Sequence, residues 1–149
     1  MMRLLTPHRA RRLAILYALL LVGVSSLPGI KLPDLSEGHL DKVLHGLEYA
    51  ILGFLVVRGW GPFREQTMSR WHEWIPYLIL IVFAAIDEYH QAWIPGRFAE
   101  WFDWMADALG ITSGYLVGMG LNLRALRSRR PPLATPATGR SQGQVQNGI

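Results

Sequence analysis

The distribution of apolar residues constrains this fold most, because it divides the chain into four long apolar blocks. These blocks are 13–30, 43–57, 75–86 and 105–123. The first is free of charge and about long enough to cross a hydrocarbon layer of ~30 Å at about 1.5 Å per helical residue. The second contains His45 and Glu48 and would fail a strict hydropathy criterion. We predict an all-α, polytopic membrane protein whose four transmembrane helices form a small bundle.

The third and fourth blocks carry signals for helix length and packing. The third remains compatible with a helix through residues 87–91, until Pro95-Gly96 stops it. The fourth contains glycines at a spacing of four, Gly110, Gly114 and Gly118, on one helical face. Such a face allows close approach of a neighbouring helix. Glycine is also simply frequent in membrane helices, which is the alternative explanation.

Arginines are concentrated in three of the five segments outside the blocks, and they predict the orientation. The arginine-rich segments contain Arg3, Arg9, Arg11, Arg12, Arg58, Arg64, Arg70, Arg124, Arg127, Arg129 and Arg130. The two remaining loops contain only Lys31 and Lys42, then Arg97. By the positive-inside rule both termini are cytoplasmic. The net charge of +4 is thus explained by topology, and we expect no nucleic acid partner.

The composition also suggests how the chain is divided. We expect a basic cytoplasmic N-terminus (1–12), a membrane domain (13–123), and a cytoplasmic tail (124–149) that is basic and then, from residue 131, disordered. A cleaved signal peptide is an alternative for the first block, because Val24-Ser25-Ser26 is an acceptable cleavage site. Without any cysteine, the chain has no disulfide or thiolate metal site.

Ionisable residues interrupt the helices at the ends predicted to face outside. Asp41, His45 and Tyr49 recur every four residues, and so do Asp103 and Asp107, so each set shares one helical face. The full set of candidates is Asp41, Lys42, His45, Tyr49, Asp87, Glu88, Gln91, Arg97, Asp103 and Asp107. Ionisable groups in a membrane are costly unless paired or hydrated, which makes them candidates for function. A cap at the water interface is the alternative.

The residue types suggest roles within this set. We assign acid/base or hydrogen-bonding roles, with catalysis left open, to Asp41, His45, Asp87 and Glu88. The expected ligand-binding residues are Lys42, Tyr49, Gln91, Arg97, Asp103 and Asp107. We expect no metal site, because a lone His45 lacks any HxxxH or HExxH spacing. If a metal did bind, an ion that prefers oxygen ligands would be favoured over zinc. No cofactor can be named.

Three motifs resemble those of the VanZ-like family of small bacterial membrane proteins. They are Asp41-Lys42-x-x-His45-x-x-x-Tyr49, Asp87-Glu88-x-x-Gln91-x-x-x-Pro95-Gly96-Arg97 and Asp103-x-x-x-Asp107-x-x-Gly110. One departure is Asp107, where that family often has Asn. The resemblance implies the bacterial inner membrane, an extracytoplasmic site and, in some members, glycopeptide resistance, chiefly to teicoplanin. It implies no particular reaction.

The leading interpretation is a membrane protein that binds or modifies a lipid-linked envelope molecule at this site, with a lipid-linked glycan or lipoglycopeptide as ligand and membrane lipids as neighbours. The enzyme and binding versions share the same residues, and the sequence does not separate them. The alternative is a non-catalytic structural or scaffolding protein of the envelope. A transporter or oligomeric channel is the less favoured class. A pore through a single chain is disfavoured because residues 78–86 are apolar, whereas an oligomeric pore is harder to exclude. The oligomeric state cannot be read from the chain.

The predicted topology can be tested by cysteine labelling, since the native chain has no cysteine. Single cysteines at Ser36 and Ala99 should react with an impermeant thiol reagent in intact cells. Cysteines at Ser69 and Ser141 should react only after the cells are opened. The reverse labelling pattern would rule out this orientation.

Overall fold

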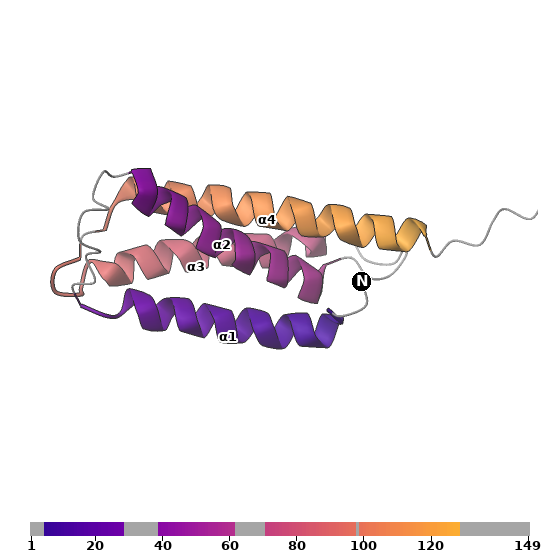
Figure 1. The fold of residues 1–149 in the computed structure, drawn as a ribbon, viewed down its shortest axis with the longest axis horizontal. Helices are drawn as coiled ribbons and strands as arrows, with labels where there is room; N and C mark the ends of the chain where they lie inside the picture. Colours follow the sequence, from indigo (N-terminus) through magenta and orange to yellow (C-terminus); the bar gives the residue numbers. More distant parts are fainter. Residues whose placement is uncertain (1–4, 29–38, 62–70, 98, 129–149) are drawn as a thin grey trace, which may run out of the picture.

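The described residues form four α-helices, which confirms the all-α architecture predicted from the apolar blocks. The structure is a computed structural model that describes residues 5–28, 39–61, 71–97 and 99–128. The helices are α1 (Pro7–Ser25), α2 (His39–Trp60), α3 (Trp71–Gln91) and α4 (Trp101–Arg127) (Figure 1). None of these described helices is both long enough and apolar enough to qualify as a membrane span. The tail predicted to be disordered, 131–149, lies outside the described residues.

Helix α2 occupies the centre of the bundle and contacts each of the other three helices, most extensively α4. Hydrogen bonds between α2 and α4 join residues 61, 62, 64 and 65 positions apart along their whole length. A nearly constant separation means that these two helices run parallel. Helices α1 and α3 run in the opposite direction, so the ends of α1 and α3 meet the beginnings of α2 and α4 at one end of the bundle (Figure 1).

Glycines allow the backbones of α2 and α4 to approach closely. A Cβ atom built on Gly110 would lie 2.1 Å from the carbonyl oxygen of Gly46, and one on Gly114 would lie 1.9 Å from that of Ala50. A Cβ on Gly118 would meet a methyl group of Val57 at 2.2 Å. These distances leave no room for any side chain. The close helix contact predicted for the glycine face is therefore confirmed, and its partner is α2.

The helix ends differ from the limits of the apolar blocks in ways that local residues explain. Helix α1 begins well before the first block, because the side chain of Thr6 caps it and Pro7 occupies its first turn. It ends at Ser25, and Pro28 disfavours helical geometry for the residue before it. Helix α3 continues through Gln91 as predicted, and Gly96 follows with a left-handed φ of 83°.

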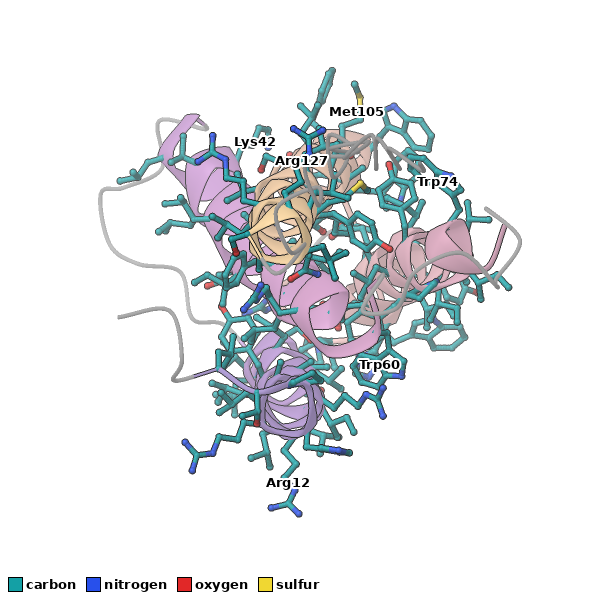
Figure 2. The ribbon with its side chains drawn as sticks, turned by 90° about the vertical axis from the view of Figure 1, so that its right-hand side faces the viewer. Arg12, Lys42, Trp60, Trp74, Met105 and Arg127 are labelled. Carbon is teal, nitrogen blue, oxygen red and sulfur yellow. The ribbon has the colours of Figure 1, made fainter. Side chains whose placement is uncertain are left out.

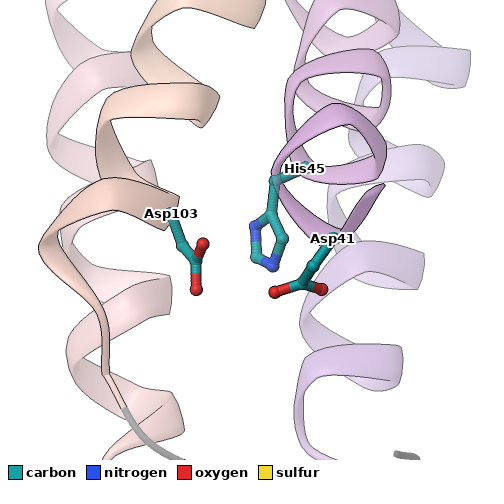
Figure 3. A group of neighbouring side chains, drawn as sticks. All are labelled: Asp41, His45 and Asp103. Carbon is teal, nitrogen blue, oxygen red and sulfur yellow. The ribbon is translucent and has the colours of Figure 1, made fainter. Parts of the chain in front are cut away.

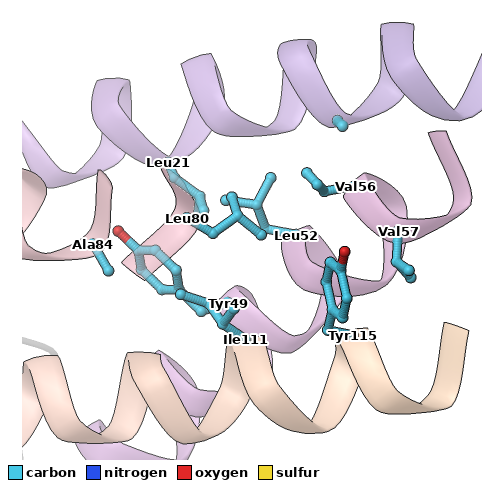
Figure 4. Close-up of a cluster of buried hydrophobic side chains, with 10 residues drawn as sticks. Leu21, Tyr49, Leu52, Val56, Val57, Leu80, Ala84, Ile111 and Tyr115 are labelled. Carbon is cyan, nitrogen blue, oxygen red and sulfur yellow. The ribbon is translucent and has the colours of Figure 1, made fainter. Parts of the chain in front are cut away.

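The core lies along α2 and draws residues from all four helices. It contains Ala14, Leu21, Tyr49, Leu52, Val56, Val57, Leu80, Ala84, Ile111 and Tyr115 (Figure 4). Helix α1 packs on α2 and α3, and among the described residues it has no contact with α4. An end-on view shows α1 on the opposite side of α2 from α4, with side chains projecting outward all around the bundle (Figure 2).

Substituting a glycine in the α2–α4 contact should separate the two helices. We expect Gly114→Ala to lower the free energy of unfolding by about 1–3 kcal/mol, because the new methyl group would overlap the Ala50 carbonyl oxygen. Gly120→Ala in the same helix is the matched control, since no atom of a described residue lies within 4 Å of its Cβ position. The control should be neutral or stabilising by up to about 1 kcal/mol. Thermal unfolding in detergent, followed by circular dichroism, measures both; equal melting temperatures would contradict the close contact.

Candidate functional site

The predicted site residues all belong to the described part of the chain, and they lie at the end where α1 and α3 finish and α2 and α4 begin (Figure 1). We call them the outer cluster: Asp41, Lys42, His45, Tyr49, Asp87, Glu88, Gln91, Arg97, Asp103 and Asp107. Asp87, Glu88, Gln91, Asp103 and Asp107 are all buried. The contacts within the outer cluster divide it into separate groups.

Lys42 joins the first turn of α2 to the beginning of α4. Its ammonium group donates to Asp103 at 2.6 Å and to the more exposed Glu100 at 3.1 Å. The hydrogen bond to Asp103 is the main reason that the pKa of Lys42 lies above its ordinary value. Lys42 therefore stays protonated in this environment, and its charge is committed to α4.

His45 and Asp107 form the second link between α2 and α4. The His45 Nδ1 atom lies 3.0 Å from an oxygen of Asp107, whose carboxyl group is almost completely buried. The carboxylate therefore fixes the orientation of the imidazole ring. A histidine oriented by a carboxylate is a common arrangement for a general base and for a metal ligand.

Asp87 accepts hydrogen bonds on both carboxylate oxygens. The Ser25 hydroxyl donates to one at 2.7 Å, and the Tyr49 hydroxyl donates to the other at 3.0 Å. These contacts join α1, α2 and α3 within the outer cluster. Asp87 was grouped with the acid/base candidates, but its two hydrogen bonds to other helices are those of a residue that joins helices.

Glu88, next in the chain, has only one of its oxygens satisfied. Its Oε1 atom accepts a hydrogen bond of 2.5 Å from the backbone N–H of Glu100. Its Oε2 atom is buried and has no hydrogen-bond partner among the described residues. An unpartnered carboxylate oxygen is costly when it is buried, so the unmet bonding capacity of Glu88 costs more than that of an exposed carboxylate such as Asp41.

Gln91 and Arg97 form a contact at the end of α3. The guanidinium group of Arg97 donates to Gln91 Oε1 at 3.0 Å and, over 3.4 Å, to the backbone oxygen of Val24. No ion pair joins Arg97 to a described carboxylate, and Asp103 is paired with Lys42 instead. Arg97 is half-buried, so its remaining donors keep partial access to solvent.

Asp41 is the predicted site residue that takes the least part in these contacts. It is exposed, and no hydrogen bond from its side chain to a described residue is present. It lies next to His45 on α2, and both side chains face Asp103 of α4 (Figure 3). Each of these three residues offers one potential metal-ligand atom, and these atoms lie within 4.8 Å of one another.

A second set of potential ligands consists of His45, Glu88 and Asp107, under the same 4.8 Å limit. It differs from the first set in burial, because both of its carboxylates are buried.

An open apolar depression on α3, lined by Ile75, Leu78, Ile79, Val82, Phe83 and Ile86, includes no residue of the outer cluster.

Two residues outside the predicted set also belong to this network. Ser25 appeared in the sequence only as part of a potential cleavage site, yet its side chain binds Asp87. Glu100 was not among the predicted site residues, yet its backbone N–H donates to Glu88 and its carboxylate pairs with Lys42. The sequence indicated this contact of Ser25 only weakly. Ser25 is a small polar residue in the last turn of its helix, level with an acidic residue of another helix.

The opposite end of the bundle carries the described arginines other than Arg97. Arg11 donates to the backbone oxygen of Gly59 at 2.8 Å and lies over the ring of Trp60, while Arg58 hydrogen-bonds Asn122. Every carboxylate whose side chain is described belongs to the half of the bundle nearer the outer cluster: Asp41, Glu48, Asp87, Glu88, Glu100, Asp103 and Asp107. The two ends therefore have opposite charge.

Removing the Asp87 carboxylate should loosen the bundle. We expect Asp87→Ala to lower the free energy of unfolding by about 1–3 kcal/mol, because the buried Tyr49 hydroxyl would lose its acceptor. Asp41→Ala, at an exposed carboxylate of the same end, is the control and should melt like the wild type. Tyr49→Phe in the Asp87→Ala background should add little further loss. Equal stability of the two alanine variants would show that Asp87 does not join the helices.

The comparisons with known proteins bear on the family alone. No curated protein and no solved structure matches the chain significantly. The family model described as VanZ/LLP1 matches residues 4–122, which include all four helices up to the last turns of α4 and the whole outer cluster. The chain therefore belongs to the VanZ/LLP1 family, a family of membrane proteins.

Proposed function

We propose that the four helices lie in the bacterial cytoplasmic membrane, and that the outer cluster binds an amphiphilic, lipid-linked envelope molecule at the extracytoplasmic face. The observation that carries this proposal is the gathering of buried carboxylates from α3 and α4: Asp87, Glu88, Asp103 and Asp107 outnumber the two basic residues that contact them, Lys42 and His45. Such an excess is costly unless a ligand, water or an ion completes it.

Embedding in a membrane is supported by the surface of the bundle. Large apolar side chains are exposed on all four helices; those exposed by more than half include Leu16, Leu19, Leu47, Leu78, Ile79, Ile86, Leu109 and Val117. Exposed apolar side chains in this number are typical of a surface that contacts lipid or another protein. The concentration of arginines at the other end is what the positive-inside rule requires of the cytoplasmic face.

The nature of the ligand is suggested by the family and by the groups present. VanZ is associated with teicoplanin resistance, and teicoplanin carries a lipid tail and acts on cell-wall precursors. A lipid-linked glycan or a lipoglycopeptide has hydroxyl and amide groups that carboxylates can bind. Arg97 presents a planar donor fork suited to phosphate.

Chemistry at the site would centre on His45. The imidazole ring is held by Asp107 at 3.0 Å, and Glu88 lies beside this pair with a buried, unpartnered oxygen. A proton donor and a proton acceptor within reach of one bond are what a hydrolase or transferase needs. The binding version of the proposal uses the same groups without that step.

A scaffolding role is the second candidate, and the Asp87 contacts favour it. A carboxylate satisfied by hydroxyl groups of two other helices behaves as a clamp. Conduction through a single chain is disfavoured, because the core between the two polar ends consists of side chains such as Leu52, Val56, Leu80 and Ile111.

Variants in bacterial cells carrying the gene separate these functions. Glu88→Gln and His45→Asn preserve shape and polarity, so we expect them to abolish the effect of the gene on teicoplanin susceptibility and on the extracted lipid and precursor profile. Their melting temperatures in detergent should stay within a few degrees of the wild type. Glu48→Gln, an identical change at an exposed position one turn away, is the matched control and should retain function. Partial loss of function in proportion to a large fall in melting temperature would instead support the scaffold.

A further inference from the structure

Three side chains from three different helices converge within the outer cluster. A ring nitrogen of His45 in α2 and carboxylate oxygens of Glu88 in α3 and Asp107 in α4 all lie within 4.8 Å of one another. We propose that His45, Glu88 and Asp107 form a binding site for one divalent transition-metal ion of the Zn²⁺ or Mn²⁺ type. The inference rests on the proposed function, because the ion would occupy the same outer cluster.

The hydrogen bonds of the Glu88 carboxylate are an independent indication that this residue binds a ligand. The Oε1 atom accepts a hydrogen bond from the backbone N–H of Glu100, while Oε2 is buried and has no partner in the part of the chain that the structure describes. The residue as a whole is 6% exposed, so water has little access to it. A buried, unpartnered carboxylate oxygen carries a desolvation cost, and a bound cation removes that cost directly.

The distances suit an ion of this kind. Bonds of about 2.0–2.2 Å to nitrogen and oxygen place neighbouring ligand atoms roughly 3–3.5 Å apart. His45 Nδ1 and the Asp107 oxygen are already 3.0 Å apart, so a metal ion could replace the proton they share. Side-chain movements on the order of 1 Å would bring Glu88 to the same spacing.

The donor set indicates which class of cation would bind. One imidazole and two carboxylates combine a ligand favoured by zinc with ligands favoured by manganese and magnesium. Three protein ligands also leave at least one position open to water or to an oxygen atom of a bound molecule. A cation here would reverse the local charge, which allows an acidic cluster to bind an anionic group such as a phosphate ester.

The competing group, Asp41, His45 and Asp103, is less suited to a metal ion (Figure 3). Its Asp103 carboxylate already accepts a hydrogen bond of 2.6 Å from the Lys42 ammonium, whose positive charge opposes a second cation. Its Asp41 carboxylate is exposed and can be hydrated without an ion. Because His45 belongs to both groups, changes at Glu88 and Asp41 distinguish them.

The test uses the full chain, purified in detergent with an affinity tag that contains no histidine and stripped with EDTA. Calorimetric titration with Zn²⁺ and with Mn²⁺, checked by metal analysis after dialysis, should show one ion per chain for at least one of them. Glu88→Gln and His45→Asn should each weaken binding by about tenfold or more. Glu48→Gln and Asp41→Asn should bind like the wild type.

Two outcomes would overturn the site. The first is that the stripped wild-type protein takes up neither ion. The second is that Asp41→Asn loses metal binding while Glu88→Gln binds the ion as the wild type does. If Glu88→Gln fails to fold, the wild type still decides: the bound ion should raise its melting temperature, and Asp107→Asn should abolish that rise. Variants that lose function in cells while the wild type binds no ion would overturn the metal site and leave the proposed function standing.

Discussion

The close approach of the α2 and α4 backbones is the constraint on which the other contacts of the outer cluster depend. With Gly110 and Gly114 lying against Gly46 and Ala50, two parallel helices are held at a fixed register. One turn away, the same register sets His45 opposite Asp107. Side chains as short as aspartate and histidine meet directly only because the helices are this close. The glycines therefore position a polar site as well as a packing contact.

The helices that run in the opposite direction complete the site in different ways. Helix α1 supplies the Ser25 hydroxyl and the backbone oxygen of Val24, while α3 supplies two adjacent acidic residues with different surroundings. Adjacent residues on a helix point about 100° apart, so Asp87 faces α1 and α2 while Glu88 faces the beginning of α4. One acidic pair in the sequence thus serves two separate purposes.

How far the sequence predicted this arrangement depends on the kind of signal. The apolar blocks predicted the helices, and the spacing of Gly110, Gly114 and Gly118 predicted a close helix contact, because both are local periodicities. The pairing of Asp87 with Ser25 was missed, since it depends on the rotation of α1 against α3. The absence of an HxxxH motif argued against a metal, but that argument applies only to ligands on one helix. His45, Glu88 and Asp107 come from three.

The contrast between Asp87 and Glu88 separates the part of the outer cluster that holds the bundle from the part that is available for binding. Both are equally buried, at 6% exposure. Asp87 has a hydroxyl donor on each oxygen, and these two hydrogen bonds join three helices. Glu88 keeps one oxygen without a donor among the described residues and lies beside a histidine already oriented by Asp107. A protein that needed the cluster only as a clamp would gain stability by satisfying that oxygen, so its unmet bonding capacity is best explained by a ligand that Glu88 shares with His45 and Asp107.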